Sequence, residues 1–193
     1  IACTAAWSCN LSTVQIARNP GMALDLSWIE NLHVNHPAIL RRTQHLGNSR
    51  SLKKEWQAAW LVRAIECMDL TTLSGDDTEG RVKRLCAKAK NPLRKDMVEA
   101  LGLRAGVQTG AVCVYHDMIP TAVDVLQGTG IPVAAVSTGF PAGLSSHETK
   151  LREIELSVKA GASEIDIVIT RKHVLQGNWQ ALYQEMKDYR KAC

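Results

Sequence analysis

Two aspartates stand inside apolar segments of the sequence. Asp166 lies between Ile165 and Ile167, and Asp69 begins the segment DLTTL. A carboxylate buried among apolar side chains is costly unless it is hydrogen-bonded, paired or turned toward a pocket. Both residues alternate with apolar neighbours, so we expect both to point to one side of their strands, where they would attract a cation such as a lysine. The alternative is structural, with each carboxylate tying its strand to a loop.

A cysteine and a threonine accompany these aspartates in neighbouring segments. Cys113 stands in the apolar run GAVCVY, where a cysteine is by default a small buried hydrophobe. No neighbouring group argues for a lowered thiol pKa. Thr71 is an ordinary strand residue, although a hydroxyl at a strand end could bind a sugar oxygen. We predict that both residues line a pocket at most.

The segments that carry these residues alternate with amphipathic helices. Apolar strands are predicted at 68–73, 110–115, 131–137 and 164–170, each followed by a helix. Thr78 is expected to cap the first of these helices, and Ser145 with Glu148 forms a capping box for the third. Strand-helix units with strands rich in Val and Ile predict an α/β fold with a parallel sheet, because parallel strands need long crossovers and are buried on both faces.

Two architectures fit such a sheet, an open doubly wound sheet and part of a (β/α)8 TIM barrel. The turn after the first strand, at 69–78, lacks the G-x-G-x-x-G of dinucleotide-binding sheets, which favours the barrel. A barrel takes about 250 residues, so four units make up its first half. We assign 1–23 to a leader, artefactual in origin, 24–66 to a helical extension and 67–193 to the half-barrel. In the extension, Pro37 begins a helix and Trp56 and Trp60 are expected to pack.

The composition excludes several classes of protein. The chain has 193 residues, of which 46% are hydrophobic and 22% charged, which is too apolar for a disordered chain. No apolar run reaches the roughly 20 residues that cross a bilayer. Six cysteines without a C-x-x-C pair favour a reducing compartment over a disulfide framework. We therefore expect a globular cytoplasmic protein.

Two further groups of polar residues have simple explanations. His33 and His36 are three residues apart, but no carboxylate or thiol cluster accompanies them, so no metal site is predicted. Residues 81–95 hold seven Lys or Arg and no acid. No aromatic residue interleaves them, so a solvated helix face is favoured over a nucleic-acid contact.

Several motifs together resemble the deoxyribose-phosphate aldolase family. The matching segments follow the family's order: DLTTL and SGDDT at 69–78, AVCVY at 111–115, VSTGFPAG at 136–143 and GASEIDIVI at 161–169. Segments 24–29 and 53–60 are similar to the helical extension of the animal members. Departures are His116 in place of proline, Ser137 in place of alanine and Thr170 in place of asparagine.

The resemblance implies a class I aldolase on a (β/α)8 barrel, without a cofactor or metal. Such an enzyme cleaves 2-deoxy-D-ribose 5-phosphate, a small phosphorylated sugar, to acetaldehyde and glyceraldehyde 3-phosphate. Asp166 matches the aspartate that shuttles protons with a lysine and water. Asp69 matches the aspartate that positions the lysines, and Thr71 and Cys113 match pocket-lining positions. The resemblance implies no nucleic-acid or membrane partner and leaves a homo-oligomer open.

The family's Schiff-base lysine and its second catalytic lysine, on strands six and seven, are expected beyond Cys193. Lys159 and Lys172 lie at a helix end and just past the fourth strand, where solvent exposure is the default. The chain begins at Ile1 and stops inside a predicted helix, so we expect both ends to be cut and this chain alone to be inactive. The alternative is a non-catalytic half-barrel that acts as a binding or interaction module.

Overall fold

A computed structural model describes residues 21–49, 51–103 and 106–193 of the chain. Residues 1–20 of the leader predicted at 1–23 lie outside the described residues. The helices are α1 (Ser27–Glu30), α2 (His36–Ser49), α3 (Lys54–Glu66), α4 (Glu79–Lys90), α5 (Lys95–Ala100), the 3-10 helix η1 (His116–Met118), α6 (Ile119–Leu126), α7 (His147–Lys159), α8 (Arg171–Leu175) and α9 (Trp179–Ala192). The strands are β1 (Asp69–Thr71), β2 (Ala111–Val114), β3 (Val133–Ser137) and β4 (Glu164–Ile167).

The four strands form one parallel sheet in the order β1-β2-β3-β4. Each strand lies beside its predecessor in the chain, and each connection carries at least one helix. Sequential parallel neighbours are the arrangement of a (β/α)8 barrel wall. The prediction of an α/β fold with the first four strand-helix units of such a barrel is therefore confirmed.

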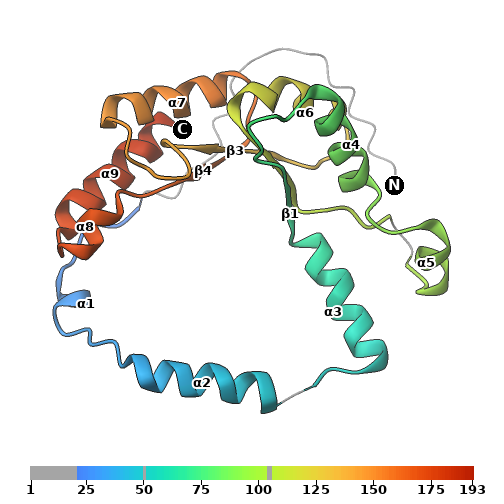
Figure 1. The fold of residues 1–193 in the computed structure, drawn as a ribbon, viewed down its shortest axis with the longest axis horizontal. Coiled ribbons are helices and arrows are strands. Elements are labelled where there is room, and N and C mark those ends of the chain that lie inside the picture. Colours follow the sequence, from blue (N-terminus) through green and yellow to red (C-terminus); the bar gives the residue numbers. More distant parts are fainter. Residues whose placement is uncertain (1–20, 50, 104–105) are drawn as a thin grey trace, which may run out of the picture.

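Helices α4, α6 and α7 cover one face of the sheet, and α9 packs against α7 (Figure 1). The main core lies between these helices and the strands, because apolar side chains alternate toward that face. Its buried members include Val82, Cys86, Val112, Val114, Ile119, Ala122, Val133 and Ala135. As predicted, Thr78 caps α4, and its hydroxyl accepts a hydrogen bond from Arg81 N.

The buried faces of α7 and α9 are more polar than expected for the predicted amphipathic helices. On α7 the buried residues are Lys150, Ile154 and Ser157, whereas Val158 is exposed. On α9 the buried residues are Glu185 and Tyr189. Polar side chains lie on these faces because each finds a hydrogen-bond partner there, which an analysis of apolar spacing does not detect.

Helix α7 also begins one residue later than its predicted capping box implies. The hydroxyl of Ser146, and not that of Ser145, accepts from Thr149 N and caps the helix. Two short helices, α5 and α8, were not predicted from the sequence. Both have fewer than seven residues, which is too short for a periodic apolar pattern to appear.

Helices α1 to α3 lie outside the sheet-and-helix body and form an arc that leaves the sheet at β1 and returns toward α8 and α9 (Figure 1). The hydroxyl of Tyr183 on α9 donates to Met22 O at 2.5 Å. Trp56 and Trp60 are 72% and 58% exposed, so the prediction that they pack into a core is wrong for this structure. Their helical spacing is real, but no described element covers the face they form.

None of the described helices is long and apolar enough to cross a membrane.

Candidate active site

The strand register brings the predicted site residues to one face of the sheet. Thr71 lies beside Cys113, and Asp69 lies beside Ala111 in the same parallel pairing. On β4, Asp166 lies beside Val136 of β3. Because side chains alternate along strands, all these residues face away from the helices that cover the other side. The prediction that Asp69 and Asp166 point to one side is therefore confirmed.

Both aspartates are exposed in this structure, so the expectation of carboxylates buried on both sides of the strand is wrong for the described chain. Neither carboxylate forms an ion pair or a hydrogen bond within the part of the chain that the structure describes. The cationic partner expected for them is likewise not among the described lysines and arginines. The Thr71 hydroxyl donates to the carbonyl of Asp69 at 2.9 Å. The two carboxylates thus remain free to bind another group.

Cys113 lies on β2, between the strands that carry Asp69 and Asp166, and the charges of both aspartates affect its pKa. It is 3% exposed, as predicted for a buried hydrophobe. Burial, together with the negative charges of Asp166 and Asp69, raises the pKa of the Cys113 thiol to about 11. The thiol is therefore protonated at neutral pH. It lines this face of the sheet and lacks the thiolate character of a nucleophile.

Glu164 is a third carboxylate on this face, which the sequence analysis missed. It lies beside Ala134, two residues before Asp166, and its charge also raises the pKa of Cys113. The alternation in the segment EIDI would have identified it, because residues two apart on a strand share a face. The face therefore carries three negative charges around one protonated thiol.

The turn after β1 is held by Asp77. Its carboxylate accepts hydrogen bonds from Thr72 Oγ1 at 2.9 Å, Ser74 N at 3.0 Å and Arg81 Nη1 at 3.1 Å. Although burial acts in the opposite direction, these hydrogen bonds lower the pKa of Asp77. The end of the strand that carries Asp69 and Thr71 is thereby joined to the first turn of α4.

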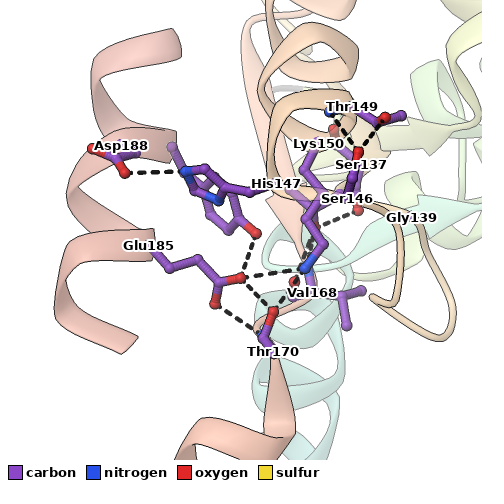
Figure 2. A network of polar contacts seen from close by, with 12 residues as sticks. Ser137, Gly139, Ser146, His147, Thr149, Lys150, Val168, Thr170, Glu185 and Asp188 are labelled. Carbon is purple, nitrogen blue, oxygen red and sulfur yellow. Dashed lines mark hydrogen bonds and ion pairs between the residues drawn. The ribbon is translucent and has the colours of Figure 1, made fainter. Parts of the chain in front are cut away.

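A buried polar network that the sequence analysis did not find holds the end of β4 (Figure 2). Lys150 Nζ lies 3.2 Å from Glu185 Oε1 and donates to Thr170 Oγ1 at 2.7 Å. Glu185 accepts from Thr170 N at 2.9 Å, from the Thr170 hydroxyl and from the Tyr189 hydroxyl at 2.7 Å. At the edge of this network, His147 Nε2 lies 3.0 Å from Asp188. The network joins α7, α9 and Thr170, the residue directly before α8.

The hydrogen bonds of this network set the charge state of Glu185. Burial acts to raise its pKa, but the bonds from Thr170, Tyr189 and Lys150 outweigh burial and lower the pKa to about 2. Burial, and after it the same carboxylate, raises the pKa of the Tyr189 hydroxyl. Glu185 is therefore ionised and Tyr189 neutral at neutral pH, as their hydrogen-bond directions require.

The remaining predicted candidates lie apart from this face. Lys159 and Lys172 are exposed, as expected. Lys172 borders a cavity of about 520 Å³ between the first turn of α7, α8 and α9, together with His173 and Ser146. Among the described residues no group of three or more His, Cys, Asp or Glu side chains could hold a metal ion.

The parallel sheet, with helices on one face and carboxylates on the other, defines a barrel-type α/β protein. Residues 63–193 match the model of the DeoC/LacD family of aldolases, and the chain belongs to that family. The chain is 53% identical over 180 residues to human deoxyribose-phosphate aldolase, covering 92% of this chain and 57% of the human protein. The corresponding mouse enzyme is 55% identical over 176 residues, covering 90% and 55%.

The solved structures agree with this fold. A candidate deoxyribose-phosphate aldolase from Coccidioides immitis superposes with a TM-score of 0.56 and 30% identity, over 68% of this chain and 46% of that one. The aldolase QR15 superposes with a TM-score of 0.53 at 21% identity, which supports the fold alone. The chain spans about half the length of the relatives it matches.

Proposed function

We propose that this chain contributes the first half of the barrel of a deoxyribose-phosphate aldolase. In this proposal residues 67–193 form the barrel units, and 24–66 form an accessory helical extension. The observation that carries the proposal is that Asp69 and Asp166, on the two outer strands of the sheet, lie on the same face as the buried Cys113. A chain of the aldolase family thus gathers its carboxylates where the interior of a closed barrel would lie.

The proposed reaction is the cleavage of 2-deoxy-D-ribose 5-phosphate. A lysine of the complete enzyme attacks the substrate aldehyde and forms a protonated imine with loss of water. The imine accepts the electron pair of the breaking carbon-carbon bond as the substrate hydroxyl loses its proton, which releases glyceraldehyde 3-phosphate. Protonation of the remaining two-carbon enamine and hydrolysis of the imine release acetaldehyde. No oxidant, reductant or cofactor is consumed.

Asp166 is the group proposed to move protons in this sequence, together with a lysine and water. A carboxylate within reach of the substrate hydroxyl serves as general base and, once protonated, as general acid. Asp69 is proposed to position the lysines, and Thr71 and Cys113 to line the pocket. The negative charge of Asp69, Glu164 and Asp166 favours a cation on this face, because an opposite charge nearby stabilises the charged form of an imine or an amine.

The proposed partner is therefore a small phosphorylated sugar, and the proposed location is the cytoplasm. The basic stretch at 81–95 is proposed to be a solvated surface without a role in nucleic-acid binding. In support, Val82, Cys86 and Ala89 occupy the buried face of α4, whereas Arg81, Lys83, Arg84 and Lys88 are exposed. A homo-oligomer of the enzyme is compatible with this proposal.

The proposal is tested on the longest natural product that carries this sequence. We expect cleavage of 2-deoxy-D-ribose 5-phosphate and, with borohydride, a covalent adduct on a lysine. Asp166→Asn is expected to lower kcat by about 10²–10⁴-fold, the usual contribution of a positioned acid or base. The control is Asp124→Asn, an exposed aspartate on α6. Full activity of Asp166→Asn, or no cleavage by the unmodified protein, would contradict the proposal.

A second function is favoured by the strand edges. Within the described residues, β1 pairs with β2 alone and β4 with β3 alone, so each leaves an edge that another chain could extend. We infer that the 193-residue chain by itself is inactive, and that if it is stable it acts as a binding module. A monodisperse, cooperatively melting product of 193 residues without aldolase activity would support the module. Turnover by residues 24–193 would refute both the module and the expected inactivity.

A further inference from the structure

Thr138 follows β3 directly and has an unusual backbone conformation. Its φ is +62°, in the left-handed region, and the residue is fully buried. A β-branched residue rarely adopts this region, because its side chain crowds the backbone. The conformation persists only where surrounding contacts compensate for it.

The compensating contacts of Thr138 are with the backbone of Val168. Thr138 Oγ1 accepts a hydrogen bond from Val168 N at 2.6 Å and lies 3.0 Å from Val168 O. It also lies 2.7 Å from Ser137 O, so its single proton faces two carbonyl oxygens. The backbone pairing of β3 with β4 ends at Ser137 and Ile167. The Thr138 side chain therefore extends this pairing by one residue.

The loop that follows Thr138 packs closely against Val168 and is also bonded to α7. Gly139 N donates to Glu153 Oε2 of α7 at 2.9 Å. A Cβ placed on Gly143, whose φ is +71°, would lie 2.7 Å from Val168 Cγ1. Glycine at 143 thus lets the loop backbone approach Val168, and the loop has little freedom to move relative to β4.

Asp166 lies two residues before Val168, so the hydrogen bond between Val168 N and Thr138 holds the backbone close to Asp166. Its carboxylate has no hydrogen bond or ion pair of its own among the described side chains, so its location follows from the backbone of β4. That backbone is held on one side by the ladder to β3 and beyond Ile167 by Thr138. We propose that Thr138 is a positioning residue that sets where the Asp166 carboxylate stands. This inference rests on the proposed function of Asp166 as the proton-transfer group.

The inference is tested in the longest natural product that carries this sequence, with Thr138→Val, which keeps the shape and removes the hydroxyl, and with Thr138→Ser, which keeps a hydroxyl at this position. We expect Thr138→Val to lower kcat by about 10–100-fold with KM little changed, because a displacement of about 1 Å is costly in catalysis. Thr138→Ser is expected to recover activity to within about threefold of the unmodified protein, since the hydroxyl makes the contact. The pH profile of kcat should shift in Thr138→Val and return in Thr138→Ser.

The matched control is Thr109→Val. Thr109 is also a buried threonine, and its hydroxyl donates to a backbone carbonyl, that of Ala111 at 3.2 Å, but it precedes β2. Thr109→Val is expected to lower stability without shifting the pH profile. If both variants lower the melting temperature and neither alters kcat per folded molecule, Thr138 is merely structural and the inference is overturned.

A second readout separates this inference from the proposed function. The carboxyl carbon of Asp166, labelled with ¹³C, is titrated by NMR in the unmodified protein, Thr138→Val and Thr138→Ser. A changed shift and midpoint in the valine variant alone supports positioning, even if no aldolase activity is found. An unchanged titration refutes it. Should Thr138→Val fail to fold, Glu153→Gln, which weakens the contact to Gly139 N, is expected to give a smaller change of the same kind, and no change would count against the inference.

Discussion

Lys150 Nζ lies 3.2 Å from Glu185 Oε1, and the two residues are only 2% and 6% exposed. They are 35 residues apart in the sequence and join α7 to α9. Thr170 N donates to the same carboxylate (Figure 2). The Tyr189 hydroxyl donates to it as well, at 2.7 Å. A buried ion pair of this kind is retained only when additional hydrogen bonds satisfy its remaining atoms.

Removing the lysine of this pair should strongly destabilise the protein. Lys150→Met leaves the Glu185 carboxylate buried without its cation, and a loss of about 3–5 kcal/mol in the free energy of unfolding is expected. The double variant Lys150→Met with Glu185→Leu should lose less than the sum of the single losses, because no unpaired charge remains. Urea denaturation measures both values.

The control for this experiment is the exposed pair of Arg152 and Glu155, which is 2.9 Å apart on α7. Arg152→Gln should cost less than about 1 kcal/mol, as exposed ion pairs contribute little. Equal losses for Lys150→Met and Arg152→Gln would contradict the importance of the buried pair.

Acid should weaken the protein through Glu185. Its pKa is lowered from 4.5 to about 2 in the folded state, so folding favours the ionised form. The resulting stabilisation is fully present above the unfolded pKa of 4.5 and is lost as the pH falls toward 2. The unfolding free energy of Glu185→Gln should therefore depend less on pH between about 5 and 2 than that of the unmodified protein. An identical pH dependence in both proteins would show that other carboxylates dominate.

The thiol of Cys113 should respond to the charge of Asp166. With a pKa of about 11 it should react with iodoacetamide at least about 100-fold more slowly at pH 8 than the exposed Cys67, as followed by mass spectrometry of the peptides. Asp166→Asn should lower the pKa of Cys113 and accelerate its alkylation at high pH, because one negative charge is removed. Asp124→Asn should leave the rate unchanged. A rate that is insensitive to Asp166→Asn would show that the carboxylate does not act on this thiol.

Gly110, just before β2, should not tolerate a side chain. A Cβ there would lie 2.9 Å from the backbone oxygen of Glu66 at the end of α3. Gly110→Ala is therefore expected to cost about 1–3 kcal/mol through overpacking against the backbone. Gly75→Ala, where no atom lies within 4 Å of the added carbon, should cost less than about 1 kcal/mol. Similar thermal melting of the two variants would mean that α3 moves away without cost.

The prediction from sequence succeeded where the controlling interactions are local. The common side of Asp69 and Asp166 follows from the alternation of side chains along a strand. The Thr78 cap follows from a hydroxyl three residues before the backbone N–H that it binds. Misplacing the cap of α7 at Ser145 reflects two adjacent serines, either of which fits the local pattern.

What the sequence by itself determined is the parallel strand-helix order and the face on which the carboxylates of Asp69 and Asp166 stand. Only the tertiary structure decided which residues of α7 and α9 are buried, that Trp56 and Trp60 remain exposed, and that Thr138 adopts a left-handed backbone to bond Val168. These outcomes depend on partners 30 or more residues away or on whether an element covers a helix face. Local periodicity carries no information on such distant contacts, whereas burial free energy and hydrogen bonding depend on them.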